Sequence, residues 1–180
     1  MHTALNSSTL LQHLLDYEAS ALKHQPDSGV DAANRWDGLA FRLDQHQLCV
    51  DVVVIDEIIP PPRLTPVPGS VDWLLGLTNV RGSLITVVDL RLFLRPERTP
   101  ITSKSQVLIT SVENQNIGLL VDEILGQRHF ATDAAEEIDV EQWQDIHQYI
   151  SKSYRQNDSD WGILNLMGLL HDRRFLDGAA

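Results

Sequence analysis

The sequence predicts a mainly β protein made of two related barrel halves, and three observations lead to this fold class. From residue 39 onward, short runs rich in β-branched residues alternate with turn signals, a pattern typical of small barrels. Two short motifs recur in the same order in the two halves of this region. The first 36 of the 180 residues instead carry a helical pattern.

The N-terminal segment is predicted to form a helix from about Thr9 to Lys23, followed by a linker, so that residues 1–36 stand apart from the barrels. Thr9 and Gln12 fit a capping box, in which a hydroxyl and an amide bind backbone groups of the first turn. The helix needs a surface for its apolar stripe, and either the chain's own barrel or a partner would serve. The stripe consists of Leu10, Leu11, Leu14, Leu15 and Leu22.

The β region contains ten strand candidates separated by turns. Three consecutive prolines at residues 60–62 end one ladder, because proline has no N–H to donate. Hairpin turns are expected at residues 81–83 and 113–116, and the acidic stretch 133–147 is expected to be partly helical. The candidates are residues 41–43, 48–50, 52–55, 58–59, 77–80, 84–88, 107–112, 117–121, 150–156 and 161–166.

An internal repeat divides the β region. Residues 54–59 (VIDEII) resemble residues 120–125 (LVDEIL), and residues 87–90 (VVDL) resemble residues 163–166 (ILNL). A short apolar segment follows the second motif in each half, so each half is predicted to end in a short helix. Asp89 and Asn165 then fall at equivalent positions, where their side chains can accept backbone N–H groups at a helix start. We expect both residues to be structural.

Charge and composition exclude several function classes. The formal net charge is −11 and no basic patch offsets it, so neither nucleic acid nor direct membrane binding is expected. The single cysteine, Cys49, cannot form an internal disulfide and is expected to be buried and inert. The sequence shows no signal peptide and no apolar run of about 20 residues, which predicts a cytoplasmic protein.

The residue pattern gives little support to catalytic or metal chemistry. The seven histidines form no HxxxH or HxH pair, and no cysteine cluster accompanies them. Neighbouring carboxylates, as in Asp56-Glu57, point to opposite faces of a strand. An enzyme using Asp56, Asp122 or His171 is an alternative, but no spacing brings these groups together. We expect no catalytic residue, no metal site and no cofactor.

The most distinctive stretch is a predicted hairpin at residues 76–94, GLTNVRGSLITVVDLRLFL. Asn79 and Gly82 suit turn conformations with positive φ. Arg81 lies between Val80 and Gly82, an unusual place for a charge. It is either an arginine exposed at a hairpin tip without further role or a donor-rich anchor for a partner.

This hairpin resembles the signature of the CheW-like family, approximately G-x-x-N-x-R-G-x-x-x-P-[VI]-[VI]-D-[LM]. Thr86 departs from it, because the family usually has proline there; a restraint on φ is lost, but no change of fold is expected. Residues 48–58 and 117–122 resemble two further strands of the family, and the resemblance covers about residues 39–170. The matching residues of the signature are Gly76, Asn79, Arg81, Gly82, Val87, Val88, Asp89 and Leu90.

The resemblance implies two packed five-stranded SH3-like β-barrels without catalytic activity. It implies a domain at residues 37–172, with halves at about 38–95 and 104–172, and a tail at 173–180. It also implies two partners: the regulatory domain of a CheA-type histidine kinase, and the cytoplasmic tip of a methyl-accepting chemoreceptor, gripped in a groove between the barrels. The expected receptor- or kinase-binding residues are Ile55 and Glu57, which share a strand face, and Asn79, Val80, Arg81 and Gly82.

Segments outside this core narrow the resemblance. The N-terminal helix, residues 64–69 and the ending at 161–175 are similar to the PilI-type adaptors of type IV pilus chemosensory systems. This likeness implies a scaffold that acts at membrane-associated receptor arrays and controls twitching motility. A flagellar-type chemotaxis adaptor is the first alternative, and a small-molecule-binding β-barrel is the second.

Overall fold

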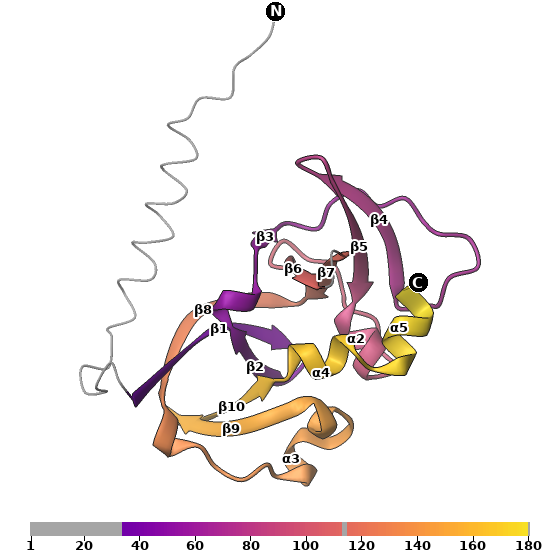
Figure 1. Ribbon diagram of the computed structural model, residues 1–180. Coiled ribbons are helices and arrows are strands. Elements are labelled where there is room, and N and C mark those ends of the chain that lie inside the picture. The colour runs from indigo at the N-terminus through magenta and orange to yellow at the C-terminus, as the bar shows by residue number, and fades with distance from the viewer. Residues whose placement is uncertain (1–33, 113–114, 180) are drawn as a thin grey trace, which may run out of the picture.

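The structure is a computed structural model that describes residues 34–112 and 115–179. Its strands form two five-stranded sheets, with short helices between and beside them (Figure 1). The predicted mainly β fold class is therefore confirmed. The expected N-terminal helix and its leucine stripe lie outside the described residues. Within the two described ranges, no helix is long and apolar enough to cross a membrane.

Sheet A has the strand order β8-β1-β2-β10-β9. β1 lies antiparallel to both β2 and β8, whereas β2 and β10 run parallel. A bridge between Glu136 and Ser153 joins the chain beyond β8 to β9, so the sheet curls toward a closed barrel. Its strands are β1 (Arg35–Leu43), β2 (His46–Asp51), β8 (Glu123–Ala131), β9 (Ile150–Gln156) and β10 (Ser159–Leu164).

Sheet B repeats this arrangement with the strand order β3-β6-β7-β5-β4. β6 lies antiparallel to β3 and β7, and β5 and β7 run parallel. A bridge between Thr65 and Leu77 joins the chain beyond β3 to β4, as its counterpart does in sheet A. Its strands are β3 (Glu57–Ile59), β4 (Leu74–Val80), β5 (Ser83–Asp89), β6 (Gln106–Val112) and β7 (Gln115–Val121).

The two halves of the sequence exchange strands between the sheets. The first half supplies β1 and β2 to sheet A but β3, β4 and β5 to sheet B. The second half supplies β6 and β7 to sheet B but β8, β9 and β10 to sheet A. The halves expected at 38–95 and 104–172 are therefore wrong as spatial units. Repeated motifs establish the order of strands along the chain, whereas sheet membership depends on which neighbour each strand pairs with.

The chain crosses between the sheets at two matching points, and the repeated Asp-Glu pairs lie there. After β2 the short 3-10 helix η2 (Val52–Val54) leads toward β3, where a strand was expected at residues 52–55. Asp51 starts this turn by accepting the N–H of Val53 at 3.1 Å. After β7 the chain passes through Asp122 directly into β8. A strand cannot continue at residues 52–55, because the chain is leaving one sheet for the other.

Two strand boundaries differ from the expectation. β1 begins at Arg35, inside the predicted linker, and the ring of Trp36 stacks on Phe130 with centroids 6.0 Å apart. β8 was not expected as a strand. Its pairing with β1 shifts register between Ala40 and Phe41, and Gly126 has a φ of 90°. This irregularity interrupts the alternation of apolar and polar residues that marks a strand in a sequence.

The core consists of three clusters, one inside each sheet and a larger one between them. Half of the buried side chains that sheet A encloses are aromatic, whereas all those that sheet B encloses are aliphatic. β1 shows the division, because Leu39 and Phe41 face the shared cluster while Ala40 faces the interior of sheet A. Burying one face of each sheet against the other makes the two sheets stabilise each other.

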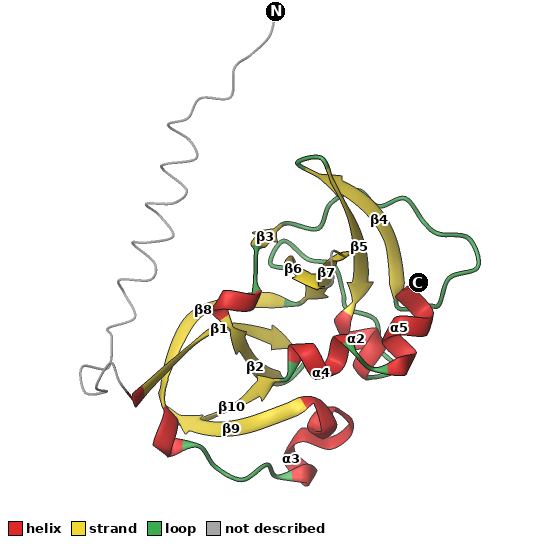
Figure 2. Cartoon of the chain, in the orientation of Figure 1, coloured by secondary structure: helices red, strands yellow, loops and turns green. Residues whose placement is uncertain are grey.

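The acidic stretch between β8 and β9 is partly helical, as expected (Figure 2). Asp139 caps α3 by accepting the N–H groups of Glu141 and Gln142. Trp143 and Ile146 from this stretch are fully buried in the shared cluster. The segment contains η3 (Thr132–Ala134), α3 (Val140–Trp143) and η4 (Gln144–Tyr149).

Asp89 and Asn165 cap two corresponding helices. Asp89 ends β5 and precedes α2 (Leu90–Leu94), and Asn165 follows β10 and precedes α4 (Leu166–Leu170). Each side-chain oxygen accepts the N–H of the third helical residue, at 3.1 Å for Leu92 and 2.9 Å for Gly168. Asp89 is 1% exposed, and it also accepts both the N–H and the hydroxyl of Thr99. Asp89 therefore ties the loop beyond α2 to the sheet, whereas Asn165 only caps its helix.

The C-terminal residues form part of the core rather than a tail. Residues 173–180 were expected to follow the domain, but α5 (Arg173–Ala179) packs its Phe175, 1% exposed, into the shared cluster. The Phe175 ring stacks on Trp73 at 5.3 Å and meets Phe93 edge-on at the same distance. These contacts explain the difference, because the buried Phe175 ring and the bond from Arg174 to the Tyr149 hydroxyl both hold α5 against the rest of the protein.

A charged cluster joins the two sheets. Arg91 and Arg95, on and just after α2, bind the two carboxylate oxygens of Asp44 at 2.9 and 3.3 Å. The N–H of Asp44 donates to the buried Asp122 at 2.6 Å. Since Asp44 lies in the β1–β2 turn of sheet A and α2 follows a strand of sheet B, this cluster connects one sheet to the other.

We expect Asp89→Ala to lower the free energy of unfolding by about 2–4 kcal/mol, because it removes a helix cap and leaves two donors of Thr99 without an acceptor. Asn165→Ala is the matched control and should cost about 1 kcal/mol. Urea unfolding measures both. Equal losses would mean that the bonds to Thr99 contribute nothing to stability.

We expect Phe175→Ala to lower the free energy of unfolding by about 3–5 kcal/mol, because a fully buried aromatic ring is lost. The neighbouring Leu176 is exposed, so Leu176→Ala should change stability by no more than about 0.5 kcal/mol. Thermal and urea unfolding of the two variants compare them. If Phe175→Ala changed the free energy of unfolding as little as Leu176→Ala, α5 would contribute nothing to the stability of the domain.

Candidate functional site

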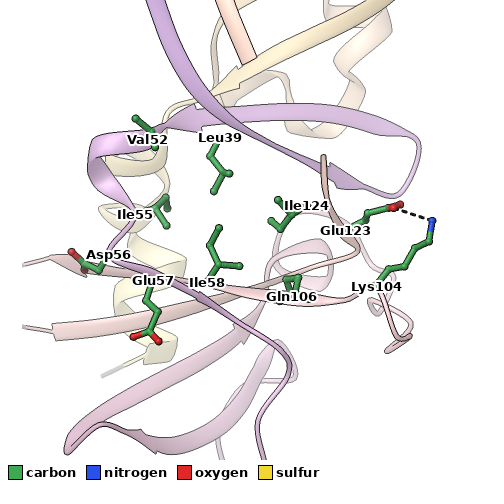
Figure 3. A pocket seen from close by; sticks show the side chains of 10 residues that line it. All are labelled: Leu39, Val52, Ile55, Asp56, Glu57, Ile58, Lys104, Gln106, Glu123 and Ile124. Atoms are coloured by element: carbon green, nitrogen blue, oxygen red, sulfur yellow. Dashed lines mark ion pairs between the residues drawn. The ribbon is translucent and has the colours of Figure 1, made fainter. Parts of the chain in front are cut away.

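A groove opens where the two crossings bring sheet A and sheet B together (Figure 3). Its volume is about 630 Å³, within the range of pockets that take a small ligand or part of a partner protein. β1 and β8 of sheet A and β3 and β6 of sheet B contribute side chains. The lining residues are Leu39, Val52, Ile55, Asp56, Glu57, Ile58, Lys104, Gln106, Glu123 and Ile124.

The middle of the groove is apolar. Figure 3 shows Leu39, Ile55, Ile58 and Ile124 converging there, with charged side chains to either side. The Ile58 side chain is partly exposed to solvent. Val53, which follows the lining residue Val52 in the sequence but does not line the groove itself, is 81% exposed. Exposed aliphatic side chains that form a contiguous patch are typical of interaction sites, whereas single ones are common on any protein surface.

One end of the groove is dominated by cations. The Nζ of Lys104 lies 2.9 Å from Glu123 Oε1, and Arg42 binds the other oxygen of the same carboxylate at 3.3 Å. The hydrogen bond from Lys104, with the bond from Arg42 adding to it, lowers the pKa of Glu123 below its ordinary value. Glu123 is therefore ionised at neutral pH and holds two cations at this end.

The opposite end carries two carboxylates. Asp56 accepts the hydroxyl of Ser111 at 2.7 Å and is otherwise exposed. Glu57 is paired with Arg81, whose Nη2 lies 3.1 Å from Glu57 Oε1. Two residues expected at a binding site from separate stretches of sequence are thus in contact in the structure.

Arg81 lies at the tip of the β4–β5 hairpin and is 80% exposed as a side chain. The two turn residues are Arg81 (φ 51°) and Gly82 (φ 89°), between the paired Val80 and Ser83. Two positive φ values in succession match the tight turn that suits a hairpin. Asn79 was expected to adopt a positive φ itself, but it remains in β4. Its side-chain oxygen instead accepts the N–H of Gly82 at 3.0 Å.

The expected site residues thus separate into three groups. Ile55 and Glu57 line the groove, although Ile55 is the residue that ends η2 rather than part of a strand. Arg81 reaches the groove through Glu57. Asn79, Val80 and Gly82 form the hairpin end that holds Arg81 in place. None of the last three lines the groove.

Several lining residues were not expected from the sequence. Glu123 and Ile124 could have been predicted from the internal repeat, because they correspond to Glu57 and Ile58 in the first half. Leu39, Lys104 and Gln106 could not, because only the pairing of strands brings them to the same place.

The groups considered for catalysis do not form one site. Asp122 is 4% exposed and bound to the Asp44 N–H, whereas Asp56 faces Ser111 at the groove. Burial raises the pKa of the Cys49 thiol to about 12, which keeps it protonated. Among the residues that the structure describes, no three His, Cys, Asp or Glu side chains lie close enough to hold a metal ion.

Comparison with known proteins identifies a family and several relatives that this chain resembles in sequence. Residues 37–174 match the CheW-like domain family. Protein PilI of Pseudomonas aeruginosa is 34% identical over 107 residues, which cover 59% of this chain and 60% of that protein. Chemotaxis protein CheW of Thermotoga maritima is 33% identical over 97 residues, which cover 54% of this chain and 64% of that protein. The chain thus spans less than two thirds of the length of either relative.

The crystal structure of the scaffolding protein TtCheW from Thermoanaerobacter tengcongensis has the same fold. It superposes with a TM-score of 0.68 at 18% sequence identity, over 83% of this chain and 95% of that chain. The family match extends over most of the 180 residues and confirms the resemblance seen in the sequence. The chain therefore belongs to the CheW-like domain family, a family of scaffold and adaptor proteins rather than of enzymes.

Proposed function

We propose that this protein is an adaptor that couples a methyl-accepting chemoreceptor to a CheA-type histidine kinase in the complex that controls type IV pilus twitching motility. It would act in the cytoplasm, at receptor arrays on the membrane. The observation that carries the proposal is the groove between the sheets, an apolar cleft with charged ends on a CheW-like fold. A cleft of this kind gives a protein partner apolar contacts for affinity and charges for register.

The Glu57–Arg81 pair supports the same reading. An ion pair this exposed contributes little to stability. Arg81 also takes a φ of 51°, where asparagine or glycine would be more comfortable. Since neither the ion pair nor the backbone conformation of Arg81 favours stability, contact with a partner is a better explanation for an arginine at this position than a structural role.

The pilus assignment rests on the likeness to PilI, at 34% identity. Chemotaxis proteins named CheW match at 33% and 28% identity, so a flagellar-type adaptor is the competing function. The two functions differ in which receptor and kinase are bound. Deleting the gene decides between them, because loss of twitching with normal swimming supports the pilus role and the reverse outcome supports the flagellar one.

We expect Arg81→Asn to weaken binding of a receptor-tip fragment by about 1–3 kcal/mol, because an exposed guanidinium that a partner buries on binding is often a hot spot. Asparagine accepts the positive φ, so the hairpin keeps its shape. Calorimetry measures the affinity, and thermal unfolding should show no loss of stability. A variant that loses stability and affinity together would identify Arg81 as a structural residue.

We expect Ile58→Asp to abolish measurable binding of the same fragment, because it puts a carboxylate in the middle of the apolar groove. Val140→Asp is the control, since Val140 is also an exposed aliphatic residue but does not line the groove. Pull-down with the fragment and with the kinase regulatory domain compares the two variants. Equal binding by both would remove the groove as the receptor site.

A further inference from the structure

The groove lies on an approximate two-fold axis that relates the two halves of the chain. Glu57 at the start of β3 pairs with Ile109 of β6, and Glu123 at the start of β8 pairs with Arg42 of β1. The two crossing strands thus meet equivalent partners in the two sheets. A half-turn about the axis exchanges Glu57 with Glu123.

Two further pairs of lining residues follow the same relation. Ile58 and Ile124 each come directly after these glutamates, and the two side chains face each other across the middle of the groove (Figure 3). Leu39 lies three residues before Arg42, and Gln106 lies three residues before Ile109. The half-turn therefore exchanges Leu39 with Gln106.

The two isoleucines at the middle of the groove do not distinguish the two directions in which a segment could bind. An occupant turned end for end still meets an isoleucine on each side of the middle. Apolar contact is non-directional and depends mainly on the area buried. Contacts other than those of the two isoleucines must therefore fix the direction of the partner.

The charges break the symmetry. Lys104 lies five residues before Ile109, and the residue five before Arg42 is Asp37. Asp37 is paired with His129 and Arg35 and does not line the groove. Arg42 itself corresponds to the uncharged Ile109.

The two ends consequently carry opposite balances of charge. At one end lie Asp56 and Glu57, of which Glu57 is paired with Arg81. At the other end Glu123 is paired with Lys104 and with Arg42, which lies outside the lining as Arg81 does. Charges at the rim of an interface contribute modestly to affinity but discriminate between arrangements of the partner.

From this geometry we infer that the charges at the two ends of the groove determine the direction in which its partner binds. The occupant is an apolar segment with a basic group near Asp56 and an acidic group near Lys104. This inference rests on the proposed function, in which that segment belongs to the receptor tip. The apolar middle supplies the affinity, and the charged ends select one of two directions.

Distances between spin labels test the inference in the full-length protein. One label is attached at Val53→Cys, beside the acidic end, and in a second sample at Ser103→Cys, beside Lys104. The native Cys49 is buried, with a thiol pKa of about 12, and should not react with the label. The probe is a helical-hairpin fragment of a chemoreceptor tip that carries one label on one arm. We expect one short and one long distance from the two protein positions.

The charges at the two ends are then exchanged by Asp56→Lys with Lys104→Glu. Each single change should lower affinity about threefold to tenfold, and the double exchange should interchange the short and long distances. The control exchange is Asp133→Lys with Lys152→Glu, which alters exposed charges away from the groove and should leave both distances unchanged.

Each outcome bears on a different claim. If the hairpin binds but the distances stay in place after the double exchange, the apolar middle sets the direction and the inference is overturned while the proposed function stands. If the hairpin does not bind the unaltered groove at all, the proposed function itself fails, and the inference with it.

Discussion

The rest of the structure depends on the exchange of strands between the two sheets. Each half of the chain begins in one sheet and ends in the other, so neither sheet is complete without both halves. The parallel pairs β2–β10 and β5–β7 join the first half to the second within each sheet. The large apolar cluster between the sheets is then buried by all parts of the chain at once. Cooperative folding of both barrels as one unit follows from this arrangement.

The two crossings share a sequence motif but have diverged in use. At the second crossing, Asp122 is buried and binds the β1–β2 turn through the N–H of Asp44, within a cluster that holds the sheets together. At the first crossing, Asp56 is exposed at the end of the groove. An equivalent carboxylate is thus structural in one half and available to a partner in the other. The repeat gives two similar places, and the surroundings of each decide its role.

The sequence was sufficient for the fold class, the repeat and the two helix caps. These follow from local patterns: β-branched runs, a repeated tetrad, and Asp89 and Asn165 ahead of apolar turns. The exchange of strands could not be predicted, because pairing of β3 with β6 leaves no mark in either segment. The bulge near Gly126 concealed β8, and the burial of Phe175 depends on Trp73, about a hundred residues earlier. For the same reason only part of the groove could be predicted: Ile55 and Glu57 line it and Arg81 pairs with Glu57, whereas Lys104 was not expected there.

Some residues that local stability would not select lie in or beside the groove. Arg81 takes a φ of 51°, Val53 is 81% exposed, and the Glu57–Arg81 pair is too solvated to stabilise the fold much. Strain or exposure of this kind persists only where the rest of the structure supplies enough stability to tolerate it. The interlocked sheets and their shared core supply that stability here. The stable fold and the unfavourable surface are therefore linked, because a core built by all strands tolerates side chains at the crossings that local stability would not select.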